Sequence, residues 1–200
     1  MEADKSVTKK IGVMGGTFDP VHNGHLAIAE KAREEFGLER VLFVPSGIPP
    51  HKQKVFAPPV HRLAMVKIAV KDNKHFTVSD MEIKRRRPSY TYDTISLVKS
   101  MYPHMEIFFI AGEDALCEIK SWHRYEELVR MTIFLVAPRE RKGSAGIPSV
   151  PFLECRFIDM PLLGMSSSYI RNCIWDKKTV KYLLPDEVLE YIRRQNLYGA

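Results

Sequence analysis

Cysteine and long apolar runs are both scarce in this sequence of 200 residues. Its three cysteines, Cys117, Cys155 and Cys173, are odd in number and include no C-x-x-C pair, which argues against a disulfide framework and a zinc ribbon. No stretch reaches the roughly 18 consecutive apolar residues that a membrane-spanning helix needs. The apolar stretch after the N-terminal lysines breaks at Gly15 and Gly16, too soon for the core of a signal peptide. We therefore expect reduced thiols, a cytoplasmic location and no membrane association.

Internal repeats and low-complexity tracts are also absent from the sequence. Hydrophobic residues make up 45% of the chain and charged residues 27%, an ordinary globular composition that argues against disorder and a coiled coil. A chain of this length buries about 70% of the surface that its unfolded form exposes, enough for one core with a small appended subdomain. The 30 basic and 24 acidic residues leave a net charge of +6, which suits anionic partners but also occurs on many soluble surfaces. Charge alone therefore selects no function.

The alternation of apolar patterns indicates the fold class. Residues 10–14 have the pattern of a buried strand, apolar positions from 26 to 36 follow helical spacing, Gly37 suits a helix C-cap, and residues 41–44 form a second β-branched run. This unit has the length that a parallel crossover requires. The same alternation predicts strands near 76–78, 106–110, 131–136 and 156–158, and helices near 60–71, 92–101, 167–175 and 186–195.

Strands that alternate with helices imply a parallel sheet covered on both faces. We expect an α/β fold with a Rossmann-like, doubly wound parallel sheet and a small C-terminal helical subdomain. The whole chain, 1–200, is predicted to be a single domain, with the Rossmann-like core over about 8–160 and the helical part over about 161–200.

Several segments outside these elements receive their own interpretations. The connection at residues 45–59 holds five prolines and is long enough to favour a functional loop, whereas residues 138–151 are interpreted as a variable surface loop. The basic run at residues 84–87 is interpreted as a solvated turn rather than a patch that steers anions. Trp175 is assigned to the core.

The most informative motif is GGTFDPVHNGH at residues 15–25, which follows the first predicted strand and begins the first predicted helix. A doubly wound sheet presents its ligand crevice at such a turn. Gly15 and Gly16 allow backbone amides to approach a ligand closely, and the helix N-terminus offers N–H groups and a positive dipole end to phosphate. A ligand that carries phosphate is therefore predicted here.

Two histidines of this motif lie three residues apart. At a helix start, His22 and His25 share a face, so both imidazoles can meet one polyphosphate. The spacing also resembles that of a pair of metal ligands, but no third ligand stands out nearby, so a zinc site is disfavoured.

The sequence resembles the T/H-x-G-H nucleotidyltransferase superfamily and, within it, the bacterial nicotinate mononucleotide adenylyltransferases. The resemblance covers nearly the whole chain, because several separate motifs occur in order. Beyond GGTFDPVHNGH these are IPPHK at 48–52, PSYT at 88–91, AGEDAL at 111–116, Trp122, SSSYIR at 166–171 and LLPDEVLEYI at 183–192.

The resemblance implies that ATP and nicotinate mononucleotide are the substrates, joined to give deamido-NAD (nicotinate adenine dinucleotide) and pyrophosphate in NAD biosynthesis. A phosphate monoester is mostly dianionic at neutral pH, so the attacking group needs no protein base. This agrees with the lack of a serine triad or a cysteine nucleophile motif. The enzyme would instead hold two polyanions in line and neutralise charge on the departing pyrophosphate. Mg²⁺ would arrive with ATP.

The resemblance also implies roles for individual residues. His22, His25 and Arg171 would be catalytic. ATP would be bound by Gly15, Gly16, Thr17, Phe18, His22, His25, Ser167, Ser168, Arg171, Gly112 and Asp114, and nicotinate mononucleotide by Gly16, Thr17, Lys52, Thr91 and Trp122. No protein metal ligand is predicted. The sequence departs from the family at Met165 and Ser168, where Ile or Val and Thr are more usual, but the hydroxyl at position 168 is retained.

Other readings of these motifs remain open. A related adenylyltransferase could use nicotinamide mononucleotide or phosphopantetheine as acceptor, and the choice between acid and amide depends on a few donors that a sequence does not locate. A nucleotide-binding sensor without turnover is the alternative from another class. RNA binding is disfavoured because no RNP-like aromatic strand or KH-type loop occurs. The oligomeric state is not readable from these residues.

Overall fold

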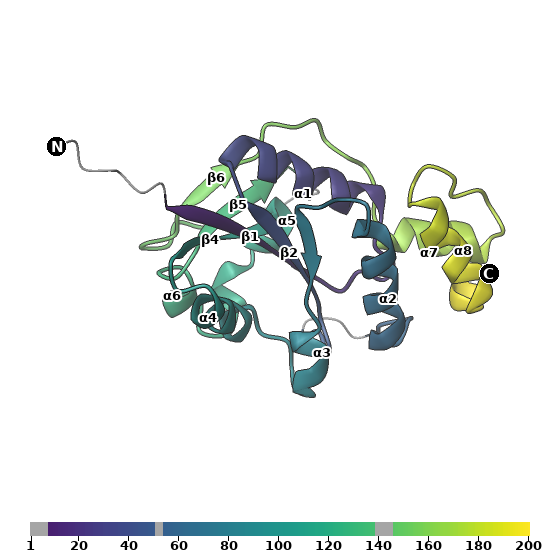
Figure 1. Ribbon diagram of the computed structural model, residues 1–200, viewed down its shortest axis with the longest axis horizontal. Coiled ribbons are helices and arrows are strands. Elements are labelled where there is room, and N and C mark those ends of the chain that lie inside the picture. The colour runs from purple at the N-terminus through teal and green to yellow at the C-terminus, as the bar shows by residue number, and fades with distance from the viewer. Residues whose placement is uncertain (1–7, 51–53, 139–145) are drawn as a thin grey trace.

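A computed structural model describes residues 8–50, 54–138 and 146–200. Its centre is a six-stranded, all-parallel sheet in the order β3-β2-β1-β4-β5-β6 (Figure 1). The strands are β1 (Lys9–Gly16), β2 (Arg40–Pro45), β3 (Phe76–Val78), β4 (Met105–Gly112), β5 (Ile133–Ala137) and β6 (Cys155–Phe157). The strand order reverses between β1 and β4, which confirms the predicted doubly wound topology.

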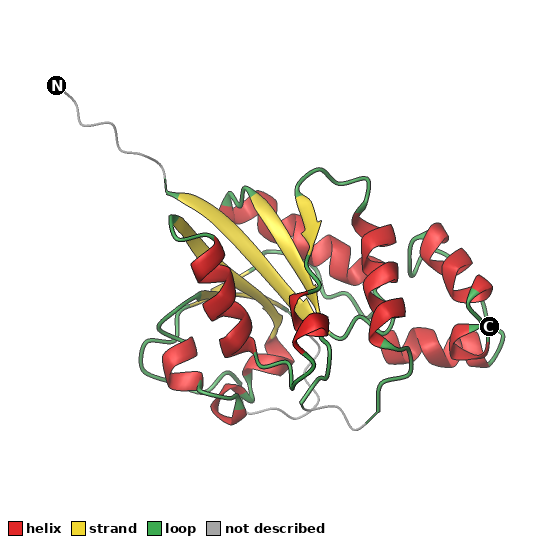
Figure 2. Cartoon of the chain, turned by 60° about the horizontal axis from the view of Figure 1, so that its bottom comes forward, coloured by secondary structure: helices red, strands yellow, loops and turns green. Residues whose placement is uncertain are grey.

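Helices cover both faces of the sheet (Figure 2). One face packs against α1 (Asn23–Phe36) and α2 (Pro59–Val70), and the same apolar cluster continues to α7 (Ser167–Trp175) and α8 (Asp186–Arg194). The other packs against α4 (Thr91–Met101), α5 (Glu113–Leu116) and α6 (Tyr125–Leu128), while α3 (Met81–Arg85) lies beside β2. Short 3-10 turns occupy Ile119–Ser121 and Leu197–Gly199. The central strand segments are buried on both sides, which explains their continuous apolar runs.

The C-terminal helices form a layer beside α2, at the right of Figure 1. Val188 and Ile192 lie one turn apart on α8 and are fully buried, as an amphipathic helix requires. The hydroxyl of Tyr191 lies 2.9 Å from Nδ1 of His61 on α2. This packing brings the end of the chain close to the carboxyl ends of the strands. The division of the chain at about residue 160 stays a prediction.

Local patterns predicted the six strands and the long helices well and missed the short helices. Gly37 ends α1 with a φ of 64°, as the helix C-cap prediction requires. Helices α3, α5 and α6 have four or five residues, too few to show a period, and were not predicted.

One interpretation of side chains holds in part and one was wrong. Lys84, Arg86 and Arg87 are exposed, as a solvated turn requires, but Arg85 ends α3 with its side chain only 12% exposed and 3.5 Å from Asp93. Trp175 is 73% exposed, since Ile170 and Ile174 form the buried face of α7 and the tryptophan side chain leaves that face. No helix in the described ranges has the length and apolar character that crossing a membrane would require.

Candidate functional site

A cavity of about 300 Å³ opens at the carboxyl ends of β1 and β4, where the strand order reverses. This is the position at which open α/β sheets bind ligands. The cavity is lined by Gly15, Gly16, Thr17, Ser46, Pro49, Pro50, Glu82, Ser89, Thr91, Phe109, Ile110, Ala111, Gly112, Ala115 and Trp122.

The loop from β1 to α1 brings Gly15, Gly16 and Thr17 of the first motif to this cavity, whereas His22 and Gly24 line a separate small recess beside Met165. Phe18 adopts a φ of 50° and buries its ring, which meets the ring of His25 edge-on at 5.0 Å. A Cβ at Gly16 would lie 3.1 Å from the Phe18 ring, so this close approach favours glycine. The loop therefore folds back on itself immediately before the helix start.

The two histidines of the motif lie together, as their spacing predicted. The rings of His22 and His25 stack with centroids 3.7 Å apart, and the backbone N–H of His22 donates to Nδ1 of His25 at 3.2 Å. Because Nδ1 of His25 accepts, its neutral imidazole carries the proton on Nε2 and can donate it to an anion. A Cβ at Gly24 would lie 3.0 Å from Nδ1 of His22, which explains the glycine between the histidines.

The second motif lies directly beside the first. At the start of α7, the Ser167 hydroxyl donates to the carbonyl of Pro20 at 2.9 Å, and Nη1 of Arg171 donates to the carbonyl of Asp19 at 2.7 Å. Nη2 of Arg171 donates to the Ser168 hydroxyl at 3.1 Å. Residues that are about 150 positions apart in the sequence thus share one end of the sheet.

Asp19, which the motif analysis did not single out as functional, lies between these groups. It is 2% exposed, and its carboxylate accepts from the N–H groups of Phe56 and Ala57 at 2.8 and 3.0 Å and from the Tyr198 hydroxyl at 2.7 Å. The motif GGTFDP did not predict the buried position of Asp19, because all three hydrogen-bond donors to its carboxylate are distant in sequence.

Arg62, also missed, is fully buried nearby. Its guanidinium donates to the carbonyls of Thr17, Gly47 and Ala57 at 2.7, 3.1 and 3.1 Å. Burial lowers the pKa of Arg62 and the nearby Asp19 carboxylate opposes this, but an arginine remains charged. Its position on the apolar face of α2, in line with Met65 and Val66, is the sequence pattern that could have predicted a buried arginine.

The residues predicted to bind a mononucleotide line the other side of the cavity. Thr91 begins α4, and Trp122 follows the 3-10 turn at Ile119–Ser121. The indole of Trp122 is half-buried and meets the rings of Phe109 and Phe134 edge-on at 6.1 and 6.4 Å. These contacts fix the ring plane while one side of the indole borders the cavity.

Glu82 on α3 contributes a buried carboxyl to the same cavity and was not predicted. It accepts a hydrogen bond from the Thr94 hydroxyl and is 5% exposed. Burial raises the pKa of Glu82, while hydrogen bonds from Thr94 and Ser89 partly offset this effect. The Ser89 hydroxyl also accepts from the N–H of Gly47 at 2.9 Å, which ties the loop before α4 to the loop after β2.

Two further predicted residues, Gly112 and Asp114, lie at the carboxyl end of β4 and on α5. Gly112 ends β4 and lines the cavity, whereas Asp114 on α5 is exposed. Lys52 lies outside the described residues. Within residues 8–50, 54–138 and 146–200, no cluster of three or more histidine, cysteine or carboxylate side chains is arranged to hold a metal ion.

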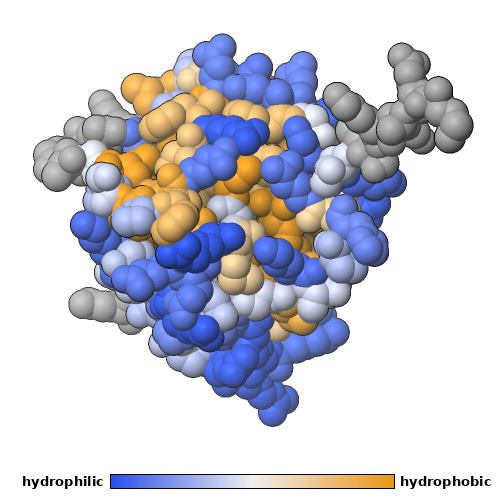
Figure 3. All heavy atoms as spheres, turned by 90° about the vertical axis from the view of Figure 1, so that its left-hand side faces the viewer, coloured by the Kyte–Doolittle hydropathy of each residue, from blue (hydrophilic) through white to orange (hydrophobic). Residues whose placement is uncertain are grey.

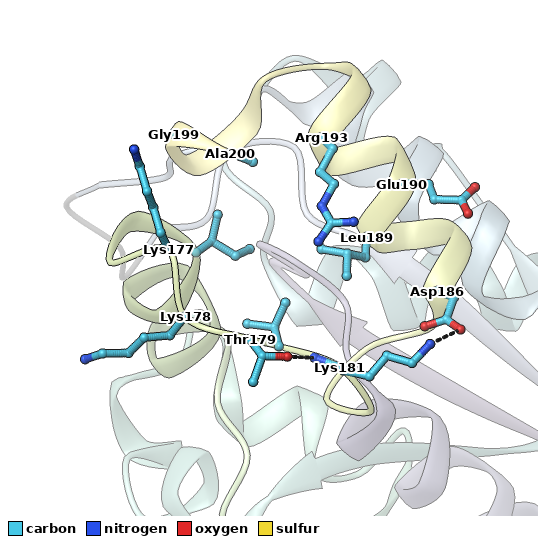
Figure 4. Close-up of a pocket in the computed structure, with 12 residues that line it drawn as sticks. Lys177, Lys178, Thr179, Lys181, Asp186, Leu189, Glu190, Arg193, Gly199 and Ala200 are labelled. Carbon is cyan, nitrogen blue, oxygen red and sulfur yellow. Dashed lines mark hydrogen bonds and ion pairs between the residues drawn. The ribbon is translucent and has the colours of Figure 1, made fainter.

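Two larger cavities lie elsewhere. One, of about 590 Å³, lies between α7 and α8; Figure 4 shows Arg193 beside Leu189 there, while Lys181 pairs with Asp186. The other, of about 710 Å³, lies near the start of β4 and β5, on the side viewed in Figure 3, where hydrophobic side chains reach the surface. Neither is lined by a residue of the two motifs that are predicted to bind phosphate, so cavity size does not identify the candidate site.

Comparisons with known proteins agree on one family. The sequence model of the cytidylyltransferase-like family matches residues 13–173. The chain is 42% identical to a probable nicotinate-nucleotide adenylyltransferase of Desulfitobacterium hafniense, over 95% of this chain and 96% of that protein. It is 39% identical to the corresponding protein of Oceanobacillus iheyensis, over 96% and 97% of the two chains.

Solved structures show the same fold. Nicotinic acid mononucleotide adenylyltransferase from Plasmodium falciparum, complexed with NaAD, superposes with a TM-score of 0.79 at 23% identity, over 95% of this chain and 97% of that one. A putative nicotinate-nucleotide adenylyltransferase from Vibrio parahaemolyticus gives a TM-score of 0.69 at 20% identity, covering 96% of each chain.

Replacing Glu82 by glutamine should remove a pH-dependent cost of folding. Burial raises the pKa of Glu82 in the folded protein above its ordinary value of 4.5, so this carboxyl ionises at a lower pH in the unfolded state. The free energy of unfolding of the wild type therefore falls as the pH rises from the unfolded-state pKa to the folded-state pKa. Glu82→Gln carries no charge, so its free energy of unfolding relative to wild type should increase from about pH 4.5 upward and then level off. Urea unfolding at several pH values measures this difference. Glu190→Gln, at an exposed position of α8, is the control, and a curve for Glu82→Gln as flat as that of the control would contradict the prediction.

Proposed function

Because this chain belongs to the nicotinate-nucleotide adenylyltransferases, within the cytidylyltransferase-like family, we propose that it transfers the adenylyl group of ATP to nicotinate mononucleotide. The products are deamido-NAD and pyrophosphate. The observation that carries the proposal is the meeting of both phosphate motifs at the carboxyl end of β1, where Arg171 and Ser167 bond to the loop before His22.

The reaction requires no general base in this proposal. A phosphate oxygen of the mononucleotide, already ionised at neutral pH, attacks the α-phosphorus of ATP, and the bond from that phosphorus to the bridging oxygen of pyrophosphate breaks. His22 and His25 donate to the ATP phosphates, and the Arg171 guanidinium neutralises charge on the departing pyrophosphate. The N-terminus of α1 adds the positive end of its dipole, while the N–H groups of Asn23 and His25 already donate to the carbonyls of Leu183 and His22.

The acceptor occupies the cavity between β1 and α4. The electron-poor pyridine ring of nicotinate mononucleotide stacks on Trp122, whose plane is fixed by Phe109 and Phe134. Thr91 lies at the N-terminus of α4, where a positive dipole end favours the ring carboxylate. Gly16 and Thr17 line the same cavity on the side of the phosphates.

Mg²⁺ enters with ATP rather than in a protein cage. It usually keeps several waters and borrows phosphate oxygens from the substrate, which fits the donor set of the described residues. In this proposal, the exposed carboxylate of Asp114 contacts its hydration shell. When bound, the ion would offset negative charge on the phosphates. The free thiols of Cys117, Cys155 and Cys173 suit a reducing, cytoplasmic location.

A panel of acceptors tests the proposal. With ATP and Mg²⁺, pyrophosphate release should be fastest with nicotinate mononucleotide and slower with nicotinamide mononucleotide or phosphopantetheine. A coupled assay with inorganic pyrophosphatase and phosphate detection measures all three. Faster release with another acceptor would assign that acceptor as the substrate. If no acceptor gives pyrophosphate release, the result would favour a nucleotide-binding sensor without turnover.

Removing either histidine should slow the chemical step. Alanine at position 22 or 25 deletes a preorganised donor, so kcat should fall by about 10²- to 10³-fold. His104→Ala, an exposed histidine in the turn before β4, is the matched control and should keep the wild-type kcat. Full turnover by either motif variant would remove that histidine from the proposed mechanism.

Removing the indole should weaken the acceptor site selectively. Aromatic stacking on a base is worth about 1–3 kcal/mol, so Trp122→Ala should raise KM for nicotinate mononucleotide by at least about fivefold and KM for ATP much less. Trp175→Ala, which deletes an exposed indole, should leave the ratio of the two KM values unchanged. Steady-state kinetics with each substrate varied in turn give the ratio, and equal rises in both KM values for Trp122→Ala would argue against stacking.

A further inference from the structure

Tyr198, two residues from the end of the chain, reaches the proposed phosphate site although no motif includes it. It lies in the 3-10 turn that follows α8, and its hydroxyl donates to Oδ1 of Asp19 at 2.7 Å. The two residues are 179 positions apart. Burial, together with the neighbouring Asp19 carboxylate, raises the pKa of Tyr198, so its hydroxyl stays protonated and remains a donor.

Asp19 receives this hydrogen bond as part of a larger set. Oδ1 also accepts from the N–H of Ala57, and Oδ2 accepts from the N–H of Phe56. These donors end the proline-rich loop and precede α2. The carboxylate therefore ties three segments together: the first phosphate loop, the end of the proline-rich loop and the C-terminal turn.

The main chain of Asp19 holds the proposed catalytic arginine. Its carbonyl accepts from Nη1 of Arg171 at 2.7 Å, and the next carbonyl, of Pro20, accepts from the Ser167 hydroxyl. A shift of Asp19 thus moves a partner of the guanidinium and the peptide that leads to His22. In-line transfer is sensitive to displacements of about 1 Å, so such a shift has kinetic consequences.

We propose that Tyr198 is a positioning residue for adenylyl transfer: its hydroxyl fixes the Asp19 carboxylate, and Asp19 in turn fixes Arg171 and the loop before His22. The inference rests on the proposed roles of Arg171 and His22, and extends the functional unit to the C-terminal turn. A hydrogen bond between a hydroxyl and a carboxylate is among the stronger ones available to a protein, which suits this task.

Tyr198→Phe tests the proposal, because it deletes the hydroxyl and keeps the ring. We expect kcat to fall by about three- to tenfold, with KM for ATP and for the mononucleotide changing less than twofold. Tyr191→Phe is the matched control: it deletes the hydroxyl that meets His61 in the same C-terminal layer but does not contact Asp19. It should lower the melting temperature and keep the wild-type kcat.

A double-variant cycle separates positioning from general destabilisation. If Tyr198 acts through Asp19, adding Tyr198→Phe to Asp19→Asn should change kcat by less than about twofold, whereas independent effects would multiply. The proposal is overturned by a Tyr198→Phe enzyme with wild-type kcat, or by effects that multiply.

A measurement that does not depend on catalysis tests this inference separately from the proposed function. In the full-length protein, amide hydrogen exchange at Phe56 and Ala57 should become faster in Tyr198→Phe and remain unchanged in Tyr191→Phe, since only the first change loosens their acceptor. Unchanged exchange in Tyr198→Phe overturns the inference. Failure of the wild-type protein to release pyrophosphate with any acceptor instead overturns the proposed function, while the exchange data still report whether Tyr198 fixes this loop.

Discussion

Two buried charges of opposite sign control the shape of the proposed phosphate loop. Asp19 and Arg62 are 2% and 0% exposed, and hydrogen bonds from or to backbone groups surround both. A buried charge is tolerated only where such partners are supplied, so the segments that supply them have little freedom to move. The loop from Thr17 to His22 is one of these segments, and its rigidity allows two imidazoles to stack at the start of α1.

This rigidity suits chemistry in which the reacting group is already ionised. Two polyanions repel each other, and donors that are fixed before the ligands arrive need no reorganisation to receive them. Backbone amides, two imidazoles and one guanidinium meet that requirement. The same reasoning explains why Gly16 and Gly24 each lie against an aromatic ring: a side chain at either position would displace a group that the loop holds in place.

The cavities of this protein illustrate why function follows position more closely than size. The crevice of about 300 Å³ lies at the reversal of the strand order, while larger cavities lie between the C-terminal helices and near the start of β4 and β5. The first lies at the carboxyl ends of β1 and β4 and beside the N-terminus of α4, where helix backbone N–H groups point outward. Position also decides burial: Trp175 is exposed although its side chain is large and apolar, because it lies off the buried face of α7.

By itself the sequence determined the class of fold and the two motifs that are proposed to bind phosphate, because strand and helix periods and the strings at residues 15–25 and 166–171 are local patterns. It also determined that His22 and His25 share a face, since three residues span almost one turn. Tertiary structure alone decided that Asp19 meets Tyr198, that Arg62 meets Thr17 and that Glu82 lines the proposed acceptor cavity. These partners lie up to 179 residues apart, and only the order of strands and the packing of helices bring them together.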